Sequence, residues 1–278
     1  MVSKDECSTM SWMQGEVTSD GVTLHYHRTG GEKPTCVLLH GITDYGFCWS
    51  RVARDLEAEY DLVMPDARGH GRSGRVTSRC SIDHLADDVA AIIRALELAP
   101  AALYGHSLGA DTAVVAAARY PELVRAVVLE DPPLWAHDDA GPPNEQLRAS
   151  AREWLMELRQ LPREELIRRR MADDPGWAED EVVPAADAKV ELDLAVLEHY
   201  QVSATYWWRA ALARIPCPIL LITGDPEQGA IVTPEVAREA EEIWHDGRVV
   251  RIAGAGHSIH RDRYDDTIAA VRGFLAST

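Results

Sequence analysis

The sequence predicts an α/β protein with a mainly parallel, doubly wound sheet. Short apolar runs alternate with stretches of helical periodicity, a pattern typical of parallel sheets covered by helices on both faces. From Pro132 to Ile215 the pattern changes to helical segments punctuated by prolines. With 278 residues, of which 46% are hydrophobic, the chain can bury one large core. We expect residues 1–131 and 216–278 to form this core and residues 132–215 to form a separate helical segment.

Each element of this fold has a local signal. The pair Asp20-Gly21 between two short segments is a hairpin signal and predicts an antiparallel edge. Apolar residues recur at helical spacing over residues 81–98, and the small-residue segment 110–120 predicts a second helix. Continuous apolar runs predict buried strands. The predicted strands are residues 17–18, 22–26, 36–39, 61–64, 100–104, 125–129, 218–223 and 249–252.

The pentapeptide Gly105-His106-Ser107-Leu108-Gly109 lies between a predicted strand and a predicted helix. Such a junction presents the serine on a sharp turn, where only glycine or another very small residue fits two positions away on either side. The N-terminus of the following helix favours negative charge on a nearby oxygen. Ser107 is therefore a candidate nucleophile, although the same spacing also occurs in ordinary turns.

An acyl-transfer site also needs a general base and backbone donors for the oxyanion. His257 follows a predicted strand on the glycine-rich loop 253–256, which makes it the candidate base. Another strand runs into the loop 40–43, whose glycine allows the backbone to approach a ligand closely. The N–H groups of Ile42 and Leu108 are the candidate oxyanion donors.

Four motifs follow one another along the chain: Leu39-His40-Gly41, Asp66-Ala67-Arg68-Gly69-His70-Gly71-Arg72-Ser73, Gly105-His106-Ser107-Leu108-Gly109 and Gly254-Ala255-Gly256-His257. In this order and spacing they resemble the α/β-hydrolase family, over about residues 21–275. The resemblance implies a mainly parallel, doubly wound sheet of the α/β-hydrolase type with a helical cap inserted after the sixth strand, over residues 132–215. It also implies that Ser107 is the nucleophile, His257 the base, and Ile42 and Leu108 the oxyanion-hole donors.

Two carboxylates compete for the role of the triad acid. In the commonest pattern of the family the acid follows the seventh strand in a Gly-Asp-x-Asp/Glu turn, where this chain has Glu227. In a minority, including haloalkane dehalogenases and zearalenone-type lactone hydrolases, the acid ends the sixth strand, where this chain has Asp131. We favour Asp131, because a carboxylate beside a buried strand end is costly unless it is paired. Glu227 remains the alternative.

Five of the eight tryptophans fall between residues 132 and 215, where they would either line an apolar cavity or pack the cap onto the core. We expect at least half of these five to do only the latter. His70, in the loop after the fourth strand, is a further candidate for the pocket. The candidate substrate contacts are Trp135, Tyr206, Trp207, Trp208 and His70.

The formal net charge is −17, and no basic run is long enough to follow a phosphate backbone. Nucleic-acid binding is therefore not expected, and the summed charge disfavours strongly anionic substrates.

The five cysteines are odd in number and lack Cys-x-x-Cys spacing, which predicts reduced thiols. No apolar segment resembles a signal peptide or a membrane-spanning helix, so we expect a cytoplasmic protein without membrane association.

These features predict a serine hydrolase that cleaves a carboxylic ester or lactone of a hydrophobic small molecule through an acyl-enzyme. No metal or other cofactor is expected. His257 and His260 have a spacing that would need further ligands to hold zinc, and a metal there would block the base. His260 is an alternative base if the loop is placed three residues later. Amide or C–C bond hydrolysis, cofactor-free perhydrolysis and a hydrolase-like small-molecule receptor remain open.

Overall fold

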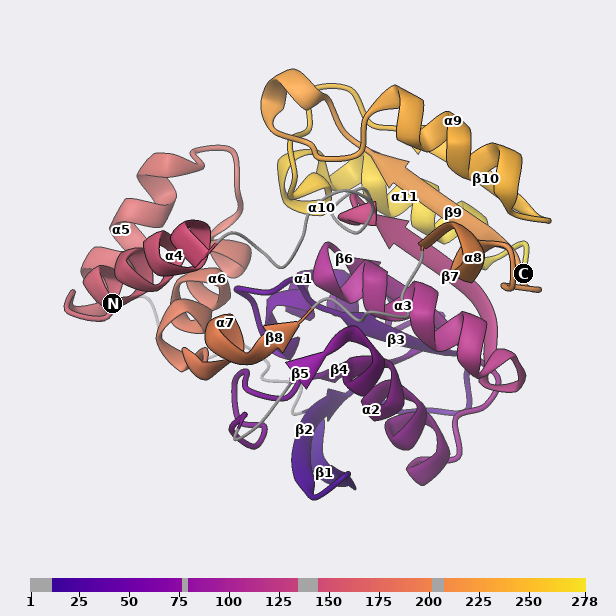
Figure 1. The fold of residues 1–278 in the computed structure, drawn as a ribbon, viewed down its shortest axis with the longest axis horizontal. Helices are drawn as coiled ribbons and strands as arrows, with labels where there is room; N and C mark the ends of the chain where they lie inside the picture. The colour runs from indigo at the N-terminus through magenta and orange to yellow at the C-terminus, as the bar shows by residue number, and fades with distance from the viewer. Residues whose placement is uncertain (1–11, 77–79, 135–144, 202–207) are drawn as a thin grey trace, which may run out of the picture.

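The computed structural model describes residues 12–76, 80–134, 145–201 and 208–278. Its main sheet has eight strands in the order β1-β2-β4-β3-β6-β7-β9-β10 (Figure 1). β1 pairs with β2, and β2 with β4, in antiparallel register, whereas every other neighbouring pair is parallel. The predicted fold class is confirmed. The strands are β1 (Met13–Ser19), β2 (Val22–Arg28), β3 (Thr35–Leu39), β4 (Asp61–Pro65), β6 (Ala101–His106), β7 (Val124–Glu130), β9 (Ile219–Thr223) and β10 (Gly247–Arg251).

Helices cover both faces of this sheet. The core helices are α1 (Ser50–Leu56), α2 (Ile82–Ala95), α3 (Leu108–Arg119), α9 (Pro234–Ile243), α10 (Ile259–Asp262) and α11 (Tyr264–Leu275). Successive side chains of a strand point to opposite faces, so the apolar runs supply two buried layers. In β3, Val37 and Leu39 belong to the layer with α2, α3 and α9, whereas Cys36 and Leu38 belong to the layer with α1 and α11.

A helical insertion follows β7, the sixth strand of the main sheet in chain order. It carries α4 (Glu145–Leu158), α5 (Arg163–Asp173), α6 (Glu179–Glu191), α7 (Ala195–His199) and α8 (Trp208–Leu212). α4 to α7 lie together beside the sheet (Figure 1), and α6 packs against α1 and the 3-10 helix η1 (Gly46–Trp49). α8 packs instead against α3 and α9. The boundaries 132 and 215 of the cap remain a prediction.

A short parallel pair, β5 (Cys80–Ser81) with β8 (Tyr200–Gln201), connects the insertion to the segment before α2.

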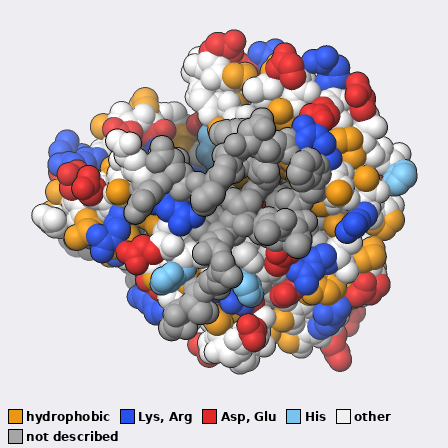
Figure 2. Space-filling model, in the orientation of Figure 1, with side chains coloured by type: hydrophobic (Ala, Val, Ile, Leu, Met, Phe, Trp, Pro, Cys, Tyr) orange, Lys and Arg blue, Asp and Glu red, His pale blue; other side chains and the backbone are white. Residues whose placement is uncertain are grey.

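On the face drawn in Figure 2, acidic and basic side chains are interspersed outside the grey atoms. Cys36, Cys48, Cys80 and Cys217 are buried free thiols, and Cys7 lies outside the described residues. Within the described ranges, no helix has both the length and the apolar character needed to cross a bilayer.

The carboxyl ends of the parallel strands meet at one edge of the sheet. β3, β6, β7, β9 and β10 run in the same direction, so the segments that follow them begin side by side. Ligands of open α/β sheets bind at this edge. It carries every residue to which the sequence assigns a catalytic role: Ile42, Ser107, Leu108, Asp131, Glu227 and His257.

Candidate active site

Ser107 lies at the turn between β6 and α3 with a backbone conformation that few non-glycine residues adopt. Its φ is 52° and its ψ is −119°, a strained combination that persists only where the surroundings enforce it. A Cβ at Gly105 would lie 2.3 Å from the carbonyl oxygen of Gly109, and a Cβ at Gly109 would lie 2.0 Å from that of Leu39. Both glycines are therefore sterically required, as the sequence predicts for this turn.

The imidazole of His257, on the loop after β10, contacts the carboxylate of Asp131 at the end of β7. His257 Nδ1 lies 2.7 Å from Asp131 Oδ2, and Asp131 is fully buried. The backbone N–H groups of Ile231 and Val232 donate to the two oxygens of the same carboxylate at 2.8 and 2.9 Å. Because carboxylate oxygens only accept hydrogen bonds, Nδ1 carries the proton and Nε2 is left as an acceptor.

Glu227, the alternative acid, lies on the exposed 3-10 turn η4 (Pro226–Gln228). Within the described ranges, the ring of His257 bonds to Asp131 and makes no hydrogen bond with Glu227. The motif residue Asp225 accepts hydrogen bonds from Arg251 Nε at 2.9 Å and from the Gly254 N–H at 2.8 Å. The turn after β9 thus stabilises the start of the His257 loop and supplies no carboxylate to the imidazole.

The loop after β3 is held by a buried histidine. His40 Nδ1 lies 2.8 Å from the Gly41 carbonyl oxygen, and its Nε2 accepts from the Ala67 N–H at 3.0 Å. The Gly41 carbonyl and the Ile42 N–H belong to one planar trans peptide unit and therefore point in opposite directions. By fixing this carbonyl, His40 also fixes the direction of the Ile42 N–H, the first predicted oxyanion donor.

The second predicted oxyanion donor, Leu108, is the first residue of α3. Its N–H is one of the four at a helix N-terminus that have no intrahelical partner. The same end of the helix carries a partial positive charge. Ile42 lines the cavity that contains Ser107, and Leu108 directly follows Ser107 in the chain. One predicted donor, Ile42, therefore shares the cavity with Ser107, and the other, Leu108, is its neighbour in the chain.

His70 was expected to contact the substrate, but in the structure it contacts the loop after β3 and is not part of the cavity wall. Its Nε2 lies 2.8 Å from the Ile42 carbonyl oxygen and its Nδ1 lies 3.0 Å from the Arg68 carbonyl oxygen. Burial and the neighbouring His40 lower the pKa of His70 to about 4. Because both ring nitrogens face backbone carbonyls and the side chain is buried, His70 supports the loop rather than lining the cavity.

Ser107 and His257 line one cavity of about 210 Å³. The core side of its wall includes Ile42 and His106, and the cap side includes Ala185. This volume is below the range of about 300–1,000 Å³ that is typical of pockets for drug-sized ligands. The cavity therefore fits a small molecule.

The described tryptophans of the cap segment divide between two roles. Trp154 and Trp177 line the cavity. Trp208, an expected substrate contact, is instead fully buried in the core, because α8 packs against α3 and α9. The other expected aromatic contacts lie outside the described residues: Trp135, Tyr206 and Trp207.

A second carboxylate at the end of β7, which the sequence did not single out, holds the same loop. Glu130 is fully buried and accepts from the Tyr104 hydroxyl at 2.6 Å and from the Nδ1 and backbone N–H of His260 at 2.7 and 2.9 Å. Burial alone would raise the pKa of Glu130, but the effects of His260 and Tyr104 are larger than that of burial. Together they lower the pKa of Glu130 to about 2. His260 therefore anchors the loop and is not part of the cavity wall. In the sequence, the only signal for this contact was that two adjacent acids, Glu130 and Asp131, are matched by two nearby histidines, His257 and His260.

The cavity wall also contains charged residues that the sequence did not single out: Asp44, Arg170, Lys189 and Arg261. They come from the loop after β3, from α5, from α6 and from α10. No periodicity within one element groups them, so only the tertiary structure brings them together. Among the residues described, no three His, Cys, Asp or Glu side chains form a group that could hold a metal ion.

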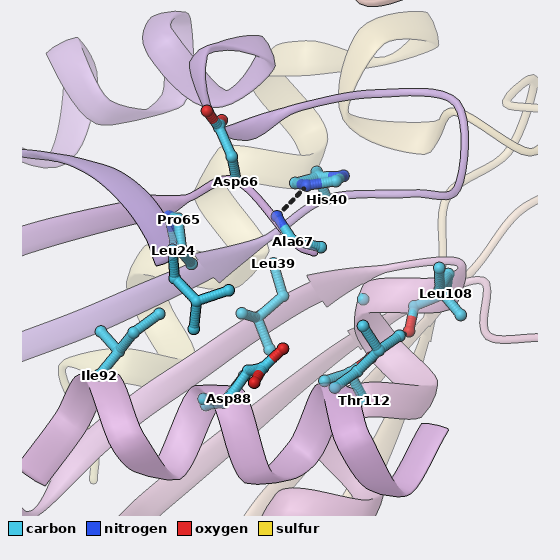
Figure 3. A pocket seen from close by; sticks show the side chains of 13 residues that line it. Leu24, Leu39, His40, Pro65, Asp66, Ala67, Asp88, Ile92, Leu108 and Thr112 are labelled. Carbon is cyan, nitrogen blue, oxygen red and sulfur yellow. Dashed lines mark hydrogen bonds between the residues drawn. The ribbon is translucent and has the colours of Figure 1, made fainter. Parts of the chain in front are cut away.

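A smaller cavity of about 30 Å³ lies between α2, α3 and the sheet (Figure 3). Leu24, Leu39 and Leu108 are among the apolar side chains of its wall. The carboxylate of Asp88 in this wall is already paired, since it accepts two hydrogen bonds from Arg68 at 2.7 and 2.6 Å. Such a volume has room for about one water molecule, so this cavity is a packing void and not a substrate site.

The chain belongs to the α/β-hydrolase family, whose model matches residues 36–271. The resemblance found in the sequence is thereby confirmed. Family and relatives together identify the chain as a hydrolase.

Two relatives and one solved structure illustrate the similarity. N-formylmaleamate deformylase of Pseudomonas putida is 29% identical over 94% of this chain and 96% of its own length. The bifunctional esterase/perhydrolase DCH of Acinetobacter calcoaceticus is 34% identical over 45% of this chain and 47% of its own length. The crystal structure of an N-formylmaleamic acid deformylase from Pseudomonas putida S16 has a TM-score of 0.78 at 22% identity, covers 94% of this chain and 100% of that chain, and shows the shared fold.

Proposed function

We propose that this chain is a serine hydrolase that cleaves an acyl bond through a covalent acyl-enzyme. Ser107 is the nucleophile, His257 the base, and Asp131 the acid that orients the base. Ile42 and Leu108 donate their N–H groups to the oxyanion. The observation that carries this proposal is the 2.7 Å contact between His257 Nδ1 and the buried Asp131, beside a cavity that His257 shares with Ser107.

The mechanism follows from these positions. His257 Nε2 accepts the hydroxyl proton while the Ser107 oxygen attacks the carbonyl carbon. Asp131 stabilises the resulting imidazolium, because its carboxylate contacts Nδ1 and is excluded from water. The N–H groups at Ile42 and Leu108 stabilise the oxyanion of the tetrahedral intermediate. His257 then protonates the leaving group, and a water molecule deprotonated by the same histidine releases the acid.

We favour a carboxylic ester or lactone as the bond that is cleaved. The similarity to an esterase/perhydrolase supports ester cleavage. An amide is the second candidate, because a relative that aligns over nearly the whole chain is a deformylase acting on N-formylmaleamate. Trp154 in the cavity wall provides a contact for an apolar part of the substrate. The unpaired thiols of the described cysteines support a cytoplasmic location.

Ser107→Ala tests the assignment of the nucleophile. We expect the variant to lose labelling by a fluorophosphonate probe and to lower kcat on the best substrate of an ester, lactone and amide panel by about three orders of magnitude or more. Ser277→Ala, at an exposed serine near the C-terminus, should retain both properties. Near-normal turnover by Ser107→Ala would overturn the proposal. Labelling of the wild-type protein without turnover of any panel member would favour the receptor alternative.

A further inference from the structure

Cationic side chains outnumber acidic ones in the described wall of the cavity that contains Ser107. Its described wall includes three cations, Arg170, Lys189 and Arg261, and one carboxylate, Asp44, whereas the chain has a net charge of −17. Asp174 offsets one of the cations through an ion pair with Arg170. Among the described ion pairs, two carboxylates, Asp44 and Asp174, therefore face these three cations.

Two of the cations share a single carboxylate. Arg261 Nη2 donates to Asp44 Oδ2 at 3.0 Å, and Lys189 Nζ lies 3.5 Å from Asp44 Oδ1. Lys189 Nζ also donates to the carbonyl and hydroxyl oxygens of Thr43 at 2.7 and 2.9 Å. The side chains of Lys189 and Arg261 are only 8% and 4% exposed. Burying two cations against one carboxylate is costly unless a further anionic group binds.

Three other carboxylates lie near these cations without a described ion pair to any of them: Glu181, Asp173 and Asp262. Glu181 acts on Arg261 at longer range, but it forms its ion pair with Arg51 at 3.0 Å. The partners of Arg261 and Lys189 in the described structure are thus Asp44 and Thr43.

The two guanidinium groups have hydrogen-bond donors that no described residue uses. The Nε atoms of Arg261 and Arg170 are buried and make no hydrogen bond with any described residue. Both groups lie over the ring of Trp177, 4.9 and 4.5 Å from its centroid. Trp177 Nε1 donates to Asp262 at 2.7 Å, and Asp262 accepts from the Gly256 N–H at 2.7 Å. The cations are therefore fixed relative to the loop after β10, which carries the candidate base.

We propose that the substrate carries a carboxylate, which Arg261 and Arg170 bind while the scissile carbonyl lies at Ser107. This inference rests on the proposed function of Ser107. Planar guanidinium groups match the two oxygens of a carboxylate, and one such anion would make the ion-paired carboxylates equal in number to the three cations. The acidity of the whole chain does not oppose binding, because salt screens exposed charges over about 8–10 Å and screens buried charges much less. The substrate is thus a small acid that also contains an ester, lactone or amide bond.

A matched pair of esters tests the inference. We expect kcat/KM for 4-nitrophenyl hydrogen adipate to exceed that for uncharged 4-nitrophenyl hexanoate by about tenfold or more. Arg170→Gln should reduce this ratio towards one, chiefly through KM, because the carboxylate binds away from the reacting carbonyl. Arg168→Gln removes the same charge from the same helix, but Arg168 is exposed and pairs with Glu165. That variant should leave the ratio unchanged.

Direct binding separates this inference from the proposed function. Glutarate should bind in calorimetry and uncharged glutaramide should not, and Arg170→Gln should abolish glutarate binding. Equal kcat/KM for the two esters without glutarate binding would overturn the carboxylate site and leave the hydrolase intact. Arg170-dependent glutarate binding by a protein that turns over neither ester would support the site and count against the hydrolase. Stronger competitive inhibition by inorganic phosphate than by glutarate would overturn the assignment of a carboxylate.

Discussion

At the scale of single residues, a buried carboxylate can hold an imidazole only if its own oxygens are satisfied. Asp131 meets this condition, since two backbone N–H groups and the ring of His257 surround it. Its φ of 42° lies in a region that non-glycine residues seldom adopt, and it turns the chain away from the sheet directly after β7. Glu227 is exposed and needs no partner.

Replacing each acid by its amide distinguishes the two candidates. Asp131→Asn should lower kcat by about 10⁴, because the amide can donate to Nδ1 and favour the wrong imidazole tautomer. Glu227→Gln should change kcat by less than about twofold, since surface substitutions seldom perturb the structure. Ester hydrolysis and circular dichroism of both variants provide the measurement. Equal, small losses of kcat would contradict the assignment of Asp131.

At the scale of secondary-structure elements, the site depends on how closely α3 approaches the strands. The clash at Gly109 would be with the backbone of Leu39 in β3, and the clash at Gly105 with the backbone of Gly109 itself. Backbone atoms cannot rotate away as the end of a long side chain can. This close contact therefore keeps α3 and its N-terminus at the carboxyl edge of the sheet.

Adding one methyl group tests this close contact. Gly109→Ala should lower the free energy of unfolding by about 3 kcal/mol, because the added Cβ forces α3 away from β3. Gly273→Ala in α11 is the control: a Cβ there meets no atom within 4 Å, and alanine should stabilise the helix by up to about 1 kcal/mol. Urea denaturation measures both changes. Wild-type stability of Gly109→Ala would contradict the packing described here.

At the scale of the whole molecule, the fold buries several histidines in neutral form near the carboxyl edge of the sheet. Burial and the neighbouring His257 lower the pKa of His106 from 6.5 to about 3. Between these two values the unfolded chain binds a proton that the folded protein does not bind. The stability contributed by the neutral form is therefore complete above about pH 6.5 and falls as the pH falls towards 3.

The pH dependence of unfolding tests this effect. For one such histidine, the free energy of unfolding should fall by up to about 1.4 kcal/mol per pH unit between about pH 6 and pH 4. His106→Asn should reduce the slope by this amount, whereas His245→Asn, at an exposed histidine, should not change it. Urea denaturation at several pH values is the measurement. An unchanged slope in His106→Asn would mean that His106 is protonated in the folded protein.

The sequence predicted those features that local interactions control. Apolar periodicity indicates the strands and core helices, because it reflects burial within one segment. The elbow around Ser107 is visible because steric limits on Gly105 and Gly109 act between near neighbours in the chain. The predicted ends of the elements were less accurate. For example, β6 runs from Ala101 to His106, whereas the strand was predicted over residues 100–104.

The sequence by itself determined the fold class, the candidate nucleophile and the candidate base, since each has a signal within a few residues. Only the tertiary structure decided which carboxylate meets His257, that His70 supports a loop, and that Trp208 packs in the core. It also brought together the cations of the cavity, where Asp44 and Arg261 are 217 positions apart. Such contacts depend on how whole elements pack, and hydrogen bonds and ion pairs form only over a few ångströms. The spacing of residues along one chain does not specify those distances.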